Sequence, residues 1–210
     1  MAILVPTTRT TYTIPQMVEA FIRAWYNEFK EIPKKQSVGI IWSQTAIETG
    51  STTAMWNNNI GNVKYSPSKN VEDDINVKYM MLANVWEIIN GKKIIFQPPH
   101  KATWFRAFDS LEEGIGFHLN FLKNKRYKSS WTAVESGSPE QFAHLLKVAK
   151  YYTAPEEDYA KGMRFHFNKF MKDNTFDNVL SSIQDQLKAP SVASVVNEFA
   201  DAFSDTEPNT

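Results

Sequence analysis

The amino-acid sequence predicts an α+β fold that is mostly α-helical and carries a small β-hairpin lobe. Apolar residues recur at helical spacing along most of the 210-residue chain. Between residues 51 and 108 this pattern gives way to turn-forming residues and a hairpin signal. The composition, 42% hydrophobic and 13% aromatic, provides enough apolar material for a packed core and excludes wholesale disorder.

Two helices are predicted before the interruption. Thr13 and Pro15 are typical of a helix start, and the helical spacing of apolar residues continues from there up to Pro33. The second helix is predicted over residues 37–48, because Gly50 is a favoured residue just past a helix end.

Four more helices are predicted after the interruption. Ser110, with Glu113 three residues later, forms a capping box that opens the first of them. Ser138 opens the next with similar chemistry, and two more are expected near residues 155–171 and 173–187.

The interruption itself is predicted to form a lobe around a hairpin. Residues 57–62 are turn formers without periodicity, so they are expected to form a loop. The Asn-Gly pair at 90–91 lies between two runs that favour β structure, which is the strongest short-range signal for a type I′ hairpin. Long connections at 65–80 and 97–104 indicate a lobe over about residues 65–104 rather than a sheet core.

The chain is expected to divide into a body, residues 1–187, and an acidic C-terminal tail, residues 188–210. The tail has one basic and four acidic residues, whereas the whole chain balances 23 of each, so the body is mildly basic. Apolar residues follow the spacing of an amphipathic helix over 190–203: Val192, Val195, Val196, Phe199 and Phe203. We expect this tail helix to fold back on the body or to meet a partner.

Charge and composition exclude several classes of protein. A formal net charge of zero argues against nucleic-acid binding, which needs an excess of Lys and Arg. The absence of cysteine excludes disulfide scaffolds, thiolate zinc sites and cysteine nucleophiles. No stretch approaches the ~20 apolar residues that span a bilayer, so membrane insertion is not expected. Residues 1–13 lack the features of a signal peptide, so none is expected.

Sequence motifs narrow the chemistry further. The chain contains no Walker loop, no G-x-S-x-G, no G-x-G-x-x-G and no H-E-x-x-H motif. Its four histidines are scattered and share no metal-ligand spacing: His100, His118, His144 and His166. We therefore expect neither a metal nor a cofactor, and carboxylates remain as the candidate catalytic groups.

Glu48 is the first candidate. Val38, Trp42 and Thr45 define an inward stripe of the helix over residues 37–48, and Glu48 follows on the same stripe. Burial and the negative end of the helix dipole both disfavour its charged form and raise its pKa. A carboxyl group of this kind can donate a proton near neutral pH. The alternative is a glutamate that caps a neighbouring loop.

Glu87 is the second candidate. It shares a strand face with Val85 and Ile89, just before the predicted turn. A carboxylate on the apolar side of a hairpin is unusual unless that face covers a binding site. The alternative is an edge-strand charge that discourages aggregation.

Several aromatic residues lie outside the predicted helices, where they could stack on sugar rings. Sugars present C–H faces that pack on aromatic rings, and the loop at 57–59 could bond hydroxyl and acetamido groups. The alternative is that most of these rings fill the core. The residues are Trp56, Tyr65, Trp86, Trp104, Tyr151 and Tyr152.

Five motifs in this order resemble those of glycoside hydrolase family 73, the bacterial and phage endo-β-N-acetylglucosaminidases. The resemblance covers about residues 17–171 and implies a lysozyme-like helical fold and cleavage of the peptidoglycan glycan strand. The motifs are QTAIETG (44–50), NNNIGNVK (57–64), WEIINGK (86–92), FRAFDSLEEGIGFHLNFL (105–122) and YYTAP…DYAKGM (151–163).

The resemblance also implies roles for individual residues. Glu48 corresponds to the catalytic acid, Glu87 to the second acidic residue, and Tyr151 to a tyrosine that lines the cleft near the acid. Glu87 would act as a base or as a nucleophile, unless the N-acetyl group of the substrate takes that role. Further residues are expected to bind substrate or shape its site: Trp56, Asn58, Asn59, Gly61, Trp86 and Tyr152.

The sequence also departs from the family pattern. Thr49 replaces the usual serine, and Ala154 stands where an aspartate is usual. These departures leave open an N-acetylmuramidase, a lytic transglycosylase, or a non-catalytic module that binds glycan or forms part of a virion. Without a signal peptide, we expect a phage product made in the host cytoplasm. It would act on the cell wall as a bacteriolytic endolysin or as a virion-associated protein, with the 190–203 helix contacting a virion component or another copy.

Overall fold

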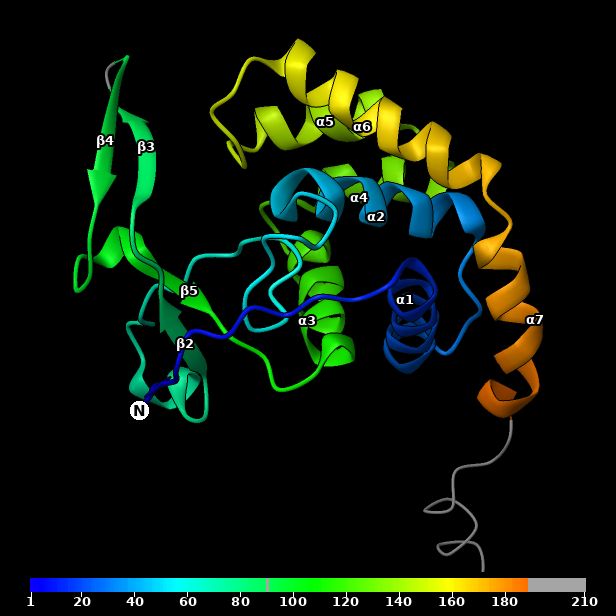
Figure 1. Ribbon diagram of the computed structural model, residues 1–210, viewed down its shortest axis with the longest axis horizontal. Helices are drawn as coiled ribbons and strands as arrows, with labels where there is room; N and C mark the ends of the chain where they lie inside the picture. The colour runs from blue at the N-terminus through cyan, green and yellow to red at the C-terminus, as the bar shows by residue number, and fades with distance from the viewer. Residues whose placement is uncertain (90, 189–210) are drawn as a thin grey trace, which may run out of the picture.

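Helices fill one side of the molecule and strands the other (Figure 1). The structure is a computed structural model that describes residues 1–89 and 91–188. The predicted tail helix at 190–203 lies outside the described residues, and so does Asn90 of the predicted turn. Among the described residues, no helix has both the length and the apolar character needed to cross a membrane.

The predicted helices are confirmed, with ends that differ by a few residues, and one further helix, α4, was not predicted. The helices are α1 Ile14–Phe29, α2 Lys35–Thr49, α3 Leu111–Lys123, α4 Lys128–Ser136, α5 Pro139–Val148, α6 Glu156–Lys172 and α7 Thr175–Lys188. Helix α4 is nine residues long, too short for helical spacing to stand out in its sequence.

Local capping explains where the first helix begins and ends. The hydroxyl of Thr13 accepts a hydrogen bond from the Gln16 N–H, and the Gln16 side chain accepts one from the Thr13 N–H in return. Lys30 adopts a left-handed conformation with φ of 56° and ends the helix. The helix therefore ends at Phe29, four residues before Pro33, which the sequence pattern gave as its limit.

Helix α2 forms the centre of the helical region and is buried on all sides. Its buried residues run without a break from Ser37 to Ala46, because α6 and α4 pack against it and α1 also contacts it. The expectation of a single inward stripe on this helix was wrong. A helix that is surrounded on every side needs no polar face, so its sequence does not show amphipathic spacing.

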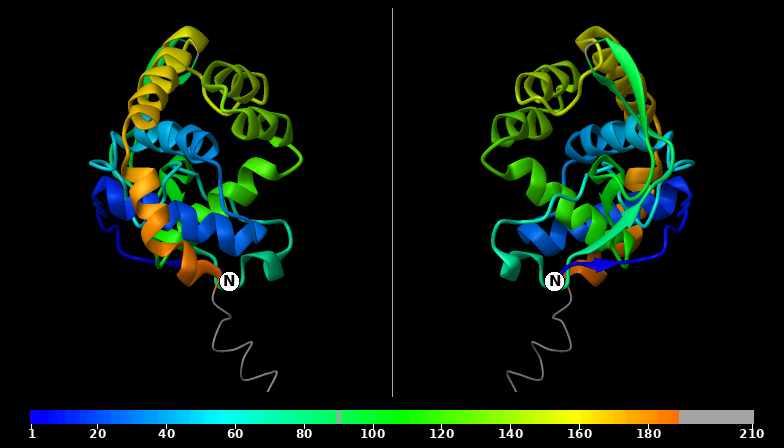
Figure 2. Two further views of the ribbon diagram at one scale, coloured as in Figure 1. Left: turned by 90° about the vertical axis from the view of Figure 1, so that its right-hand side faces the viewer. Right: turned by 90° about the vertical axis from the view of Figure 1, so that its left-hand side faces the viewer.

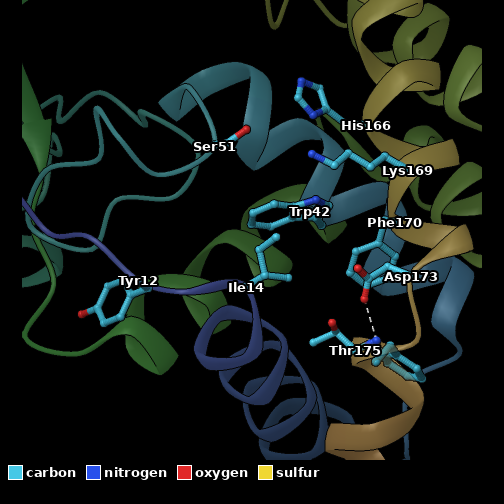
Figure 3. Close-up of a pocket in the computed structure, with 10 residues that line it drawn as sticks. Tyr12, Ile14, Trp42, Ser51, His166, Lys169, Phe170, Asp173 and Thr175 are labelled. Carbon is cyan, nitrogen blue, oxygen red and sulfur yellow. Dashed lines mark hydrogen bonds between the residues drawn. The ribbon is translucent and has the colours of Figure 1, made fainter.

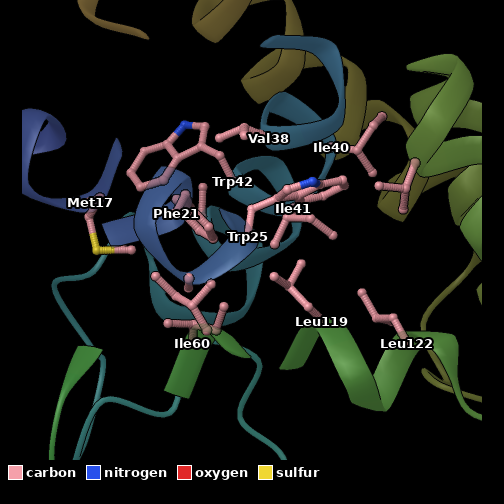
Figure 4. Close-up of a cluster of buried hydrophobic side chains, with 14 of the residues drawn as sticks. Met17, Phe21, Trp25, Val38, Ile40, Ile41, Trp42, Ile60, Leu119 and Leu122 are labelled. Carbon is pink, nitrogen blue, oxygen red and sulfur yellow. The ribbon is translucent and has the colours of Figure 1, made fainter. Parts of the chain in front are cut away.

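The main core lies between α1, α2 and α3 (Figure 4). Full burial of one large apolar side chain contributes about 1.5–3 kcal/mol, so this cluster holds the three helices in fixed relative positions. The residues labelled in the figure are Met17, Phe21, Trp25, Val38, Ile40, Ile41, Trp42, Ile60, Leu119 and Leu122.

The strand region contains a three-stranded sheet that was not predicted. Strand β1 (Ile3–Leu4) pairs in parallel with β2 (Lys78–Met81), which pairs antiparallel with β5 (Trp104–Arg106). The long connections predicted at 65–80 and 97–104 therefore include strand ends, together with short 3₁₀ helices. Strands of two to four residues carry too little periodicity to be recognised in a sequence.

The predicted hairpin is confirmed as β3 (Val85–Ile89) and β4 (Lys92–Phe96), with Ile89 opposite Lys92. It rises to the height of α5 and α6, and the side views place it on the same side of the molecule as α6 (Figures 1 and 2). The end of α2 that carries Glu48 points toward this side (Figure 1). The fold thus sets the hairpin on the side of the molecule toward which the end of α2 points (Figure 1).

Candidate active site

Glu48 lies in the last turn of α2, and the local chain fixes where that helix stops. Gly50 takes a left-handed conformation, with φ of 56°, and its N–H donates to the Ala46 carbonyl oxygen. The side-chain amide of Asn62 donates to the backbone carbonyl oxygen of Glu48. This bond satisfies one of the carbonyl groups left free at a helix end, and it ties the 57–62 loop to α2.

The Glu48 carboxyl group is held by Tyr159. The Tyr159 hydroxyl, on the first turns of α6, donates to Glu48 Oε1 at 3.1 Å. Burial raises the pKa of Glu48 to about 7, and the bond from Tyr159 opposes that rise. The Glu48 side chain still has some solvent-exposed surface. The protein therefore shields the carboxyl group from most water but leaves it accessible to a substrate.

Tyr151 lies close to Glu48 but bonds elsewhere. Its hydroxyl donates to the Gly61 carbonyl oxygen at 3.0 Å. Burial raises the pKa of Tyr151 well above its ordinary value, and the charge of Glu48 adds to this rise, which places the ring within electrostatic reach of the acid. The position agrees with the expected place beside the acid, and a catalytic role for Tyr151 stays a prediction.

Tyr159 is the residue that sequence reasoning missed. It belongs to the fifth motif, but roles were assigned only to Tyr151 and Tyr152. Its ring stacks on that of Tyr152, with centroids 3.9 Å apart, and the Tyr152 hydroxyl donates to the Ala143 carbonyl oxygen at 2.9 Å. Its place on the buried face of α6, four residues before Met163, was the one available signal.

Asn58 and Asn59 have their side chains occupied by the protein itself. The Asn58 amide donates to the Phe108 carbonyl oxygen at 3.0 Å, and its oxygen accepts from the Tyr12 hydroxyl at 2.7 Å. The Asn59 amide donates to the carbonyl oxygens of Val63 and Arg106. Both residues are buried, so the structure favours a role in shaping the loop, and direct substrate contact stays a prediction.

Gly61 is required by close packing in the same loop. A Cβ atom at this position would lie 2.3 Å from Cε1 of the His118 ring, which no side chain permits. The chain therefore passes directly over His118 while its carbonyl oxygen accepts from Tyr151. Gly61 thus supports the Tyr151 ring, and its role in shaping a substrate site stays a prediction.

Glu87 forms an ion pair with Lys64, which lies between the 57–62 loop and β2. Among the described residues it makes no hydrogen bond with Glu48, and it is not among the causes of the raised Glu48 pKa. Two carboxylates that share a site raise the pKa of one of them strongly. The partner that the structure gives Glu87 is therefore Lys64, and no coupling to Glu48 is found among the described residues.

Trp56 and Trp86 line the same hollow at the base of the hairpin, with a volume of about 530 Å³. Trp86 is 56% exposed, and Lys93 lies 4.9 Å from its ring centre. Arg9 lies 4.8 Å from the ring centre of Trp56. By contrast, Tyr65 is buried and stacks between residues of the strand region. The two tryptophans are thus available to a ligand, whereas Tyr65 fills the lobe.

A more enclosed pocket of about 140 Å³ lies between α1, α2, α6 and α7 (Figure 3). Trp42 and Phe170 give it apolar walls, and Glu48 is not among its lining residues. Its carboxylate, Asp173, accepts a hydrogen bond from the Thr175 N–H at 2.7 Å. That group is committed to the turn between α6 and α7, so this pocket lacks the acid chemistry found at Glu48.

Comparison with known proteins identifies the family. The glucosaminidase family, described as mannosyl-glycoprotein endo-beta-N-acetylglucosaminidase, matches residues 34–172, and the chain therefore belongs to this family of glycoside hydrolases. A crystal structure of a peptidoglycan hydrolase mutant from Sphingomonas sp. A1 shares the fold, with a TM-score of 0.52 and 21% identity. The match covers 80% of this chain and 99% of that chain. None of the curated proteins compared with the chain matches it.

These comparisons confirm the family resemblance and the mostly helical, lysozyme-like α+β fold. The matched region begins one residue before α2 and ends with α6. It therefore contains Glu48, Tyr159, Tyr151 and Glu87. The protein is a glycoside hydrolase, and the group best suited to donate a proton in its described residues is the buried, hydrogen-bonded carboxyl of Glu48.

Proposed function

We propose that the protein hydrolyses β-1,4 glycosidic bonds of the peptidoglycan glycan strand as an endo-β-N-acetylglucosaminidase, with Glu48 as the general acid. The observation that carries the proposal is the pKa of Glu48, about 7, at a helix end beside two tyrosines. At neutral pH a substantial share of Glu48 is therefore protonated and able to donate. Family membership supplies the glycosidic bond as the target, and the peptidoglycan hydrolase fold supports this polymer as the substrate.

In this proposal Glu48 gives its proton to the glycosidic oxygen while the bond to the anomeric carbon breaks. The sugar passes through an oxocarbenium-like state, and water then adds to the anomeric carbon. The hydroxyl of Tyr159 stabilises the carboxylate that Glu48 becomes, because it already donates to Oε1. The same bond that lowers the pKa of the resting acid therefore favours the proton transfer.

The second step depends on what activates water. Glu87 is held by Lys64 rather than by a group at Glu48, so we favour the routes that need no close carboxylate pair at ~5–5.5 Å. Two routes remain: Glu87 takes the proton of water across the ~6.5–9.5 Å of an inverting enzyme, or the substrate's acetamido oxygen attacks the anomeric carbon first. In the acetamido route the Glu48 carboxylate accepts the proton of the water that opens the ring. Nearly complete loss of activity in Glu87→Gln supports the first route, and a retained rate supports the second.

The proposal is tested by comparing Glu48→Gln with Glu135→Gln on purified peptidoglycan. Glu135 is an exposed glutamate on α4, so its substitution controls for loss of one surface carboxylate. General acid assistance contributes ~10²–10⁴-fold, so Glu48→Gln should release reducing ends at least about 100 times more slowly than wild type. Equal rates for Glu48→Gln and wild type contradict the assignment.

An endolysin or virion setting and a partner for the 190–203 helix stay predictions of the sequence, because no described residue bears on them. The proposal also has a non-catalytic alternative, in which the protein binds glycan without cutting it. Binding of wild-type protein to walls with no new ends would support that alternative.

A further inference from the structure

A buried polar chain leads from Glu48 into the core of the helical region. Tyr159 donates to Glu48 Oε1 at 3.1 Å, and the amide of Gln44 lies beside the Tyr159 hydroxyl. On its other side, the Gln44 Oε1 atom lies 2.9 Å from Nε2 of His118. Neither Gln44 nor His118 was assigned a role from the sequence.

Gln44 lies one helical turn before Glu48 on α2, so the two side chains share a face of the helix. It is fully buried. Its Nε2 atom has no hydrogen-bond partner of ordinary geometry in the described residues, but its amide is close enough to lower the pKa of Tyr159 by hydrogen bonding. A contact that lowers the pKa of a tyrosine is one in which the neighbouring group acts as a donor, so the amide acts toward Tyr159 through its N–H side.

His118 comes from α3 and is almost completely buried. Burial lowers its pKa to about 4, so the ring is neutral near pH 7 and carries a single N–H. Because Gln44 Oε1 is an acceptor, that hydrogen belongs on Nε2. The Nδ1 atom then has no partner in the described residues and faces the chain at Gly61.

A half-satisfied polar pair in an apolar core is destabilising, and native structures keep few such groups. Two apolar side chains of similar volume would pack here without that penalty. The pair instead stands behind Tyr159, with Gln44 on the same helix as Glu48 and His118 on α3. Its position offers a functional reason for keeping it.

We propose that His118 and Gln44 are positioning residues that fix the direction of the hydrogen bond from Tyr159 to Glu48. The His118 N–H holds the Gln44 amide in one orientation, with its oxygen toward the ring and its nitrogen toward Tyr159. With an N–H group facing its oxygen, the Tyr159 hydroxyl directs its own hydrogen to Glu48. A flipped amide would offer Tyr159 an acceptor, and the hydroxyl would then donate to Gln44 and release the acid. This inference rests on the proposed role of Glu48.

The first test substitutes each partner by an apolar residue of similar shape, His118→Phe and Gln44→Met. Each should lower kcat by about tenfold to a hundredfold, the scale of a misplaced reacting group, with little change in KM. Each should also raise the pKa of Glu48, because the bond from Tyr159 that lowers it is weakened. His166→Phe is the matched control, since His166 lies on α6 in the pocket of Figure 3, whose lining does not include Glu48.

The double variant separates positioning from packing. Replacing both polar partners together removes the unmatched groups, so thermal stability should recover relative to either single variant. If the pair positions the acid, kcat stays low in the double variant although stability recovers. A kcat that returns together with stability overturns the proposal, and so does an unchanged kcat in both single variants.

Two NMR measurements need no activity. In wild-type protein, ¹⁵N shifts of His118 should show the neutral Nε2–H form at pH 6, and a hydrogen on Nδ1 overturns the proposal even if no variant folds. Carboxyl ¹³C titration of Glu48 should give a higher pKa in Gln44→Met than in wild type. An active Gln44→Met enzyme alongside an inactive Glu48→Gln enzyme would reject positioning while keeping the acid. Activity retained by Glu48→Gln would instead reject the proposed function.

Discussion

As the proposed general acid, Glu48 would have to meet two opposing requirements within one side chain. It needs burial to stay protonated near neutral pH, and it needs a hydrogen-bond donor that stabilises the carboxylate after the proton has been transferred. The structure provides the first through the crowded end of α2 and the second through Tyr159. Tyr159 can serve because burial, followed by the charge of Glu48, raises its pKa well above the ordinary value and keeps its hydroxyl protonated.

The rate should therefore follow the protonation of Glu48. We expect kcat/KM to fall as pH rises through about 7, since the acid must carry its proton. Tyr159→Phe removes a donor that stabilises the charged form, so the alkaline limb should move to higher pH while kcat falls. Two titratable groups face Glu48: Tyr159 on α6, and Tyr151 in the segment that precedes α6. A pH–rate profile of both proteins measures the shift, and a limb that moves to lower pH contradicts the geometry.

Glu48 should also make stability depend on pH. Its pKa is about 7 in the folded protein and 4.5 ordinarily, so between these values the folded state keeps a proton that the unfolded state releases. Stability from this residue is thus highest at and below pH 4.5 and falls as pH rises toward 7. Above pH 7 the loss is about 3 kcal/mol.

Glu48→Gln removes this loss. Its stability advantage over wild type should grow from near zero at pH 4 to about 3 kcal/mol at pH 8. Urea unfolding at several pH values provides the measurement, with Glu135→Gln as the exposed control. A gap that does not change with pH means that the Glu48 carboxyl is not buried as described.

Sequence reasoning at the residue scale singled out Glu48 as the candidate acid but not the residues that contact it. Glu48 was identified because its motif and its place at a helix end are both local features. Tyr159, Gln44 and His118 act through contacts between α2, α3 and α6, separated by 74 and 111 residues along the chain. Such contacts exist only in the folded protein, so spacing within one helix could not predict them.

The β3–β4 hairpin is a regular two-stranded element that nevertheless exposes apolar side chains to solvent. Two strands alone are marginal in water, and β3–β4 leaves Trp86, Ile88 and Ile95 at least partly exposed on one face. Trp86 lies opposite Ile95 and lines the hollow that it shares with Trp56. An aromatic ring that stacks on sugar would account for this exposure.

Trp86→Ala and Ile95→Ala form a matched pair on that face, with 56% and 58% exposure. Each substitution removes the same Trp86–Ile95 cross-strand contact, so this loss is equal in both variants. Beyond it, each should change the free energy of unfolding by less than about 0.5 kcal/mol. If Trp86 stacks on glycan, only its substitution should raise KM, by several-fold, and kcat should change little. Equal effects of the two substitutions on KM contradict a specific stacking role.

Elements that depend on tertiary pairing were the ones that the sequence could not predict. The hairpin was predicted because its two strands are joined by a short turn of recognisable residues. In the sheet of β1, β2 and β5, the paired strands β1 and β2 are more than 70 residues apart, and all three short strands lack a local signal. The uniform burial of α2 was missed for the same reason, since it follows from the neighbours of the helix.

At the scale of the whole molecule, Glu48 lies on a helix that is packed on all sides, whereas the β3–β4 hairpin has fewer contacts with the rest of the fold. Helix α2 is fixed on all sides by its neighbours, whereas the hairpin that carries Glu87 is joined to the rest of the molecule at its base. The fold class was predicted from helical spacing and a hairpin signal, and the family from five motifs distributed along the chain; both are confirmed. The relative position of Glu48 and Glu87 could not be predicted from the sequence, because it depends on how the hairpin packs against the rest of the molecule.

The most direct test of the central claim is mass spectrometry of purified peptidoglycan after digestion with the wild-type protein and with Glu48→Gln. We predict that wild type releases fragments that end in reducing N-acetylglucosamine and that Glu48→Gln releases almost none. Fragments that end in reducing or anhydro N-acetylmuramic acid would contradict the proposed bond, and identical products from both proteins would contradict Glu48 as the acid.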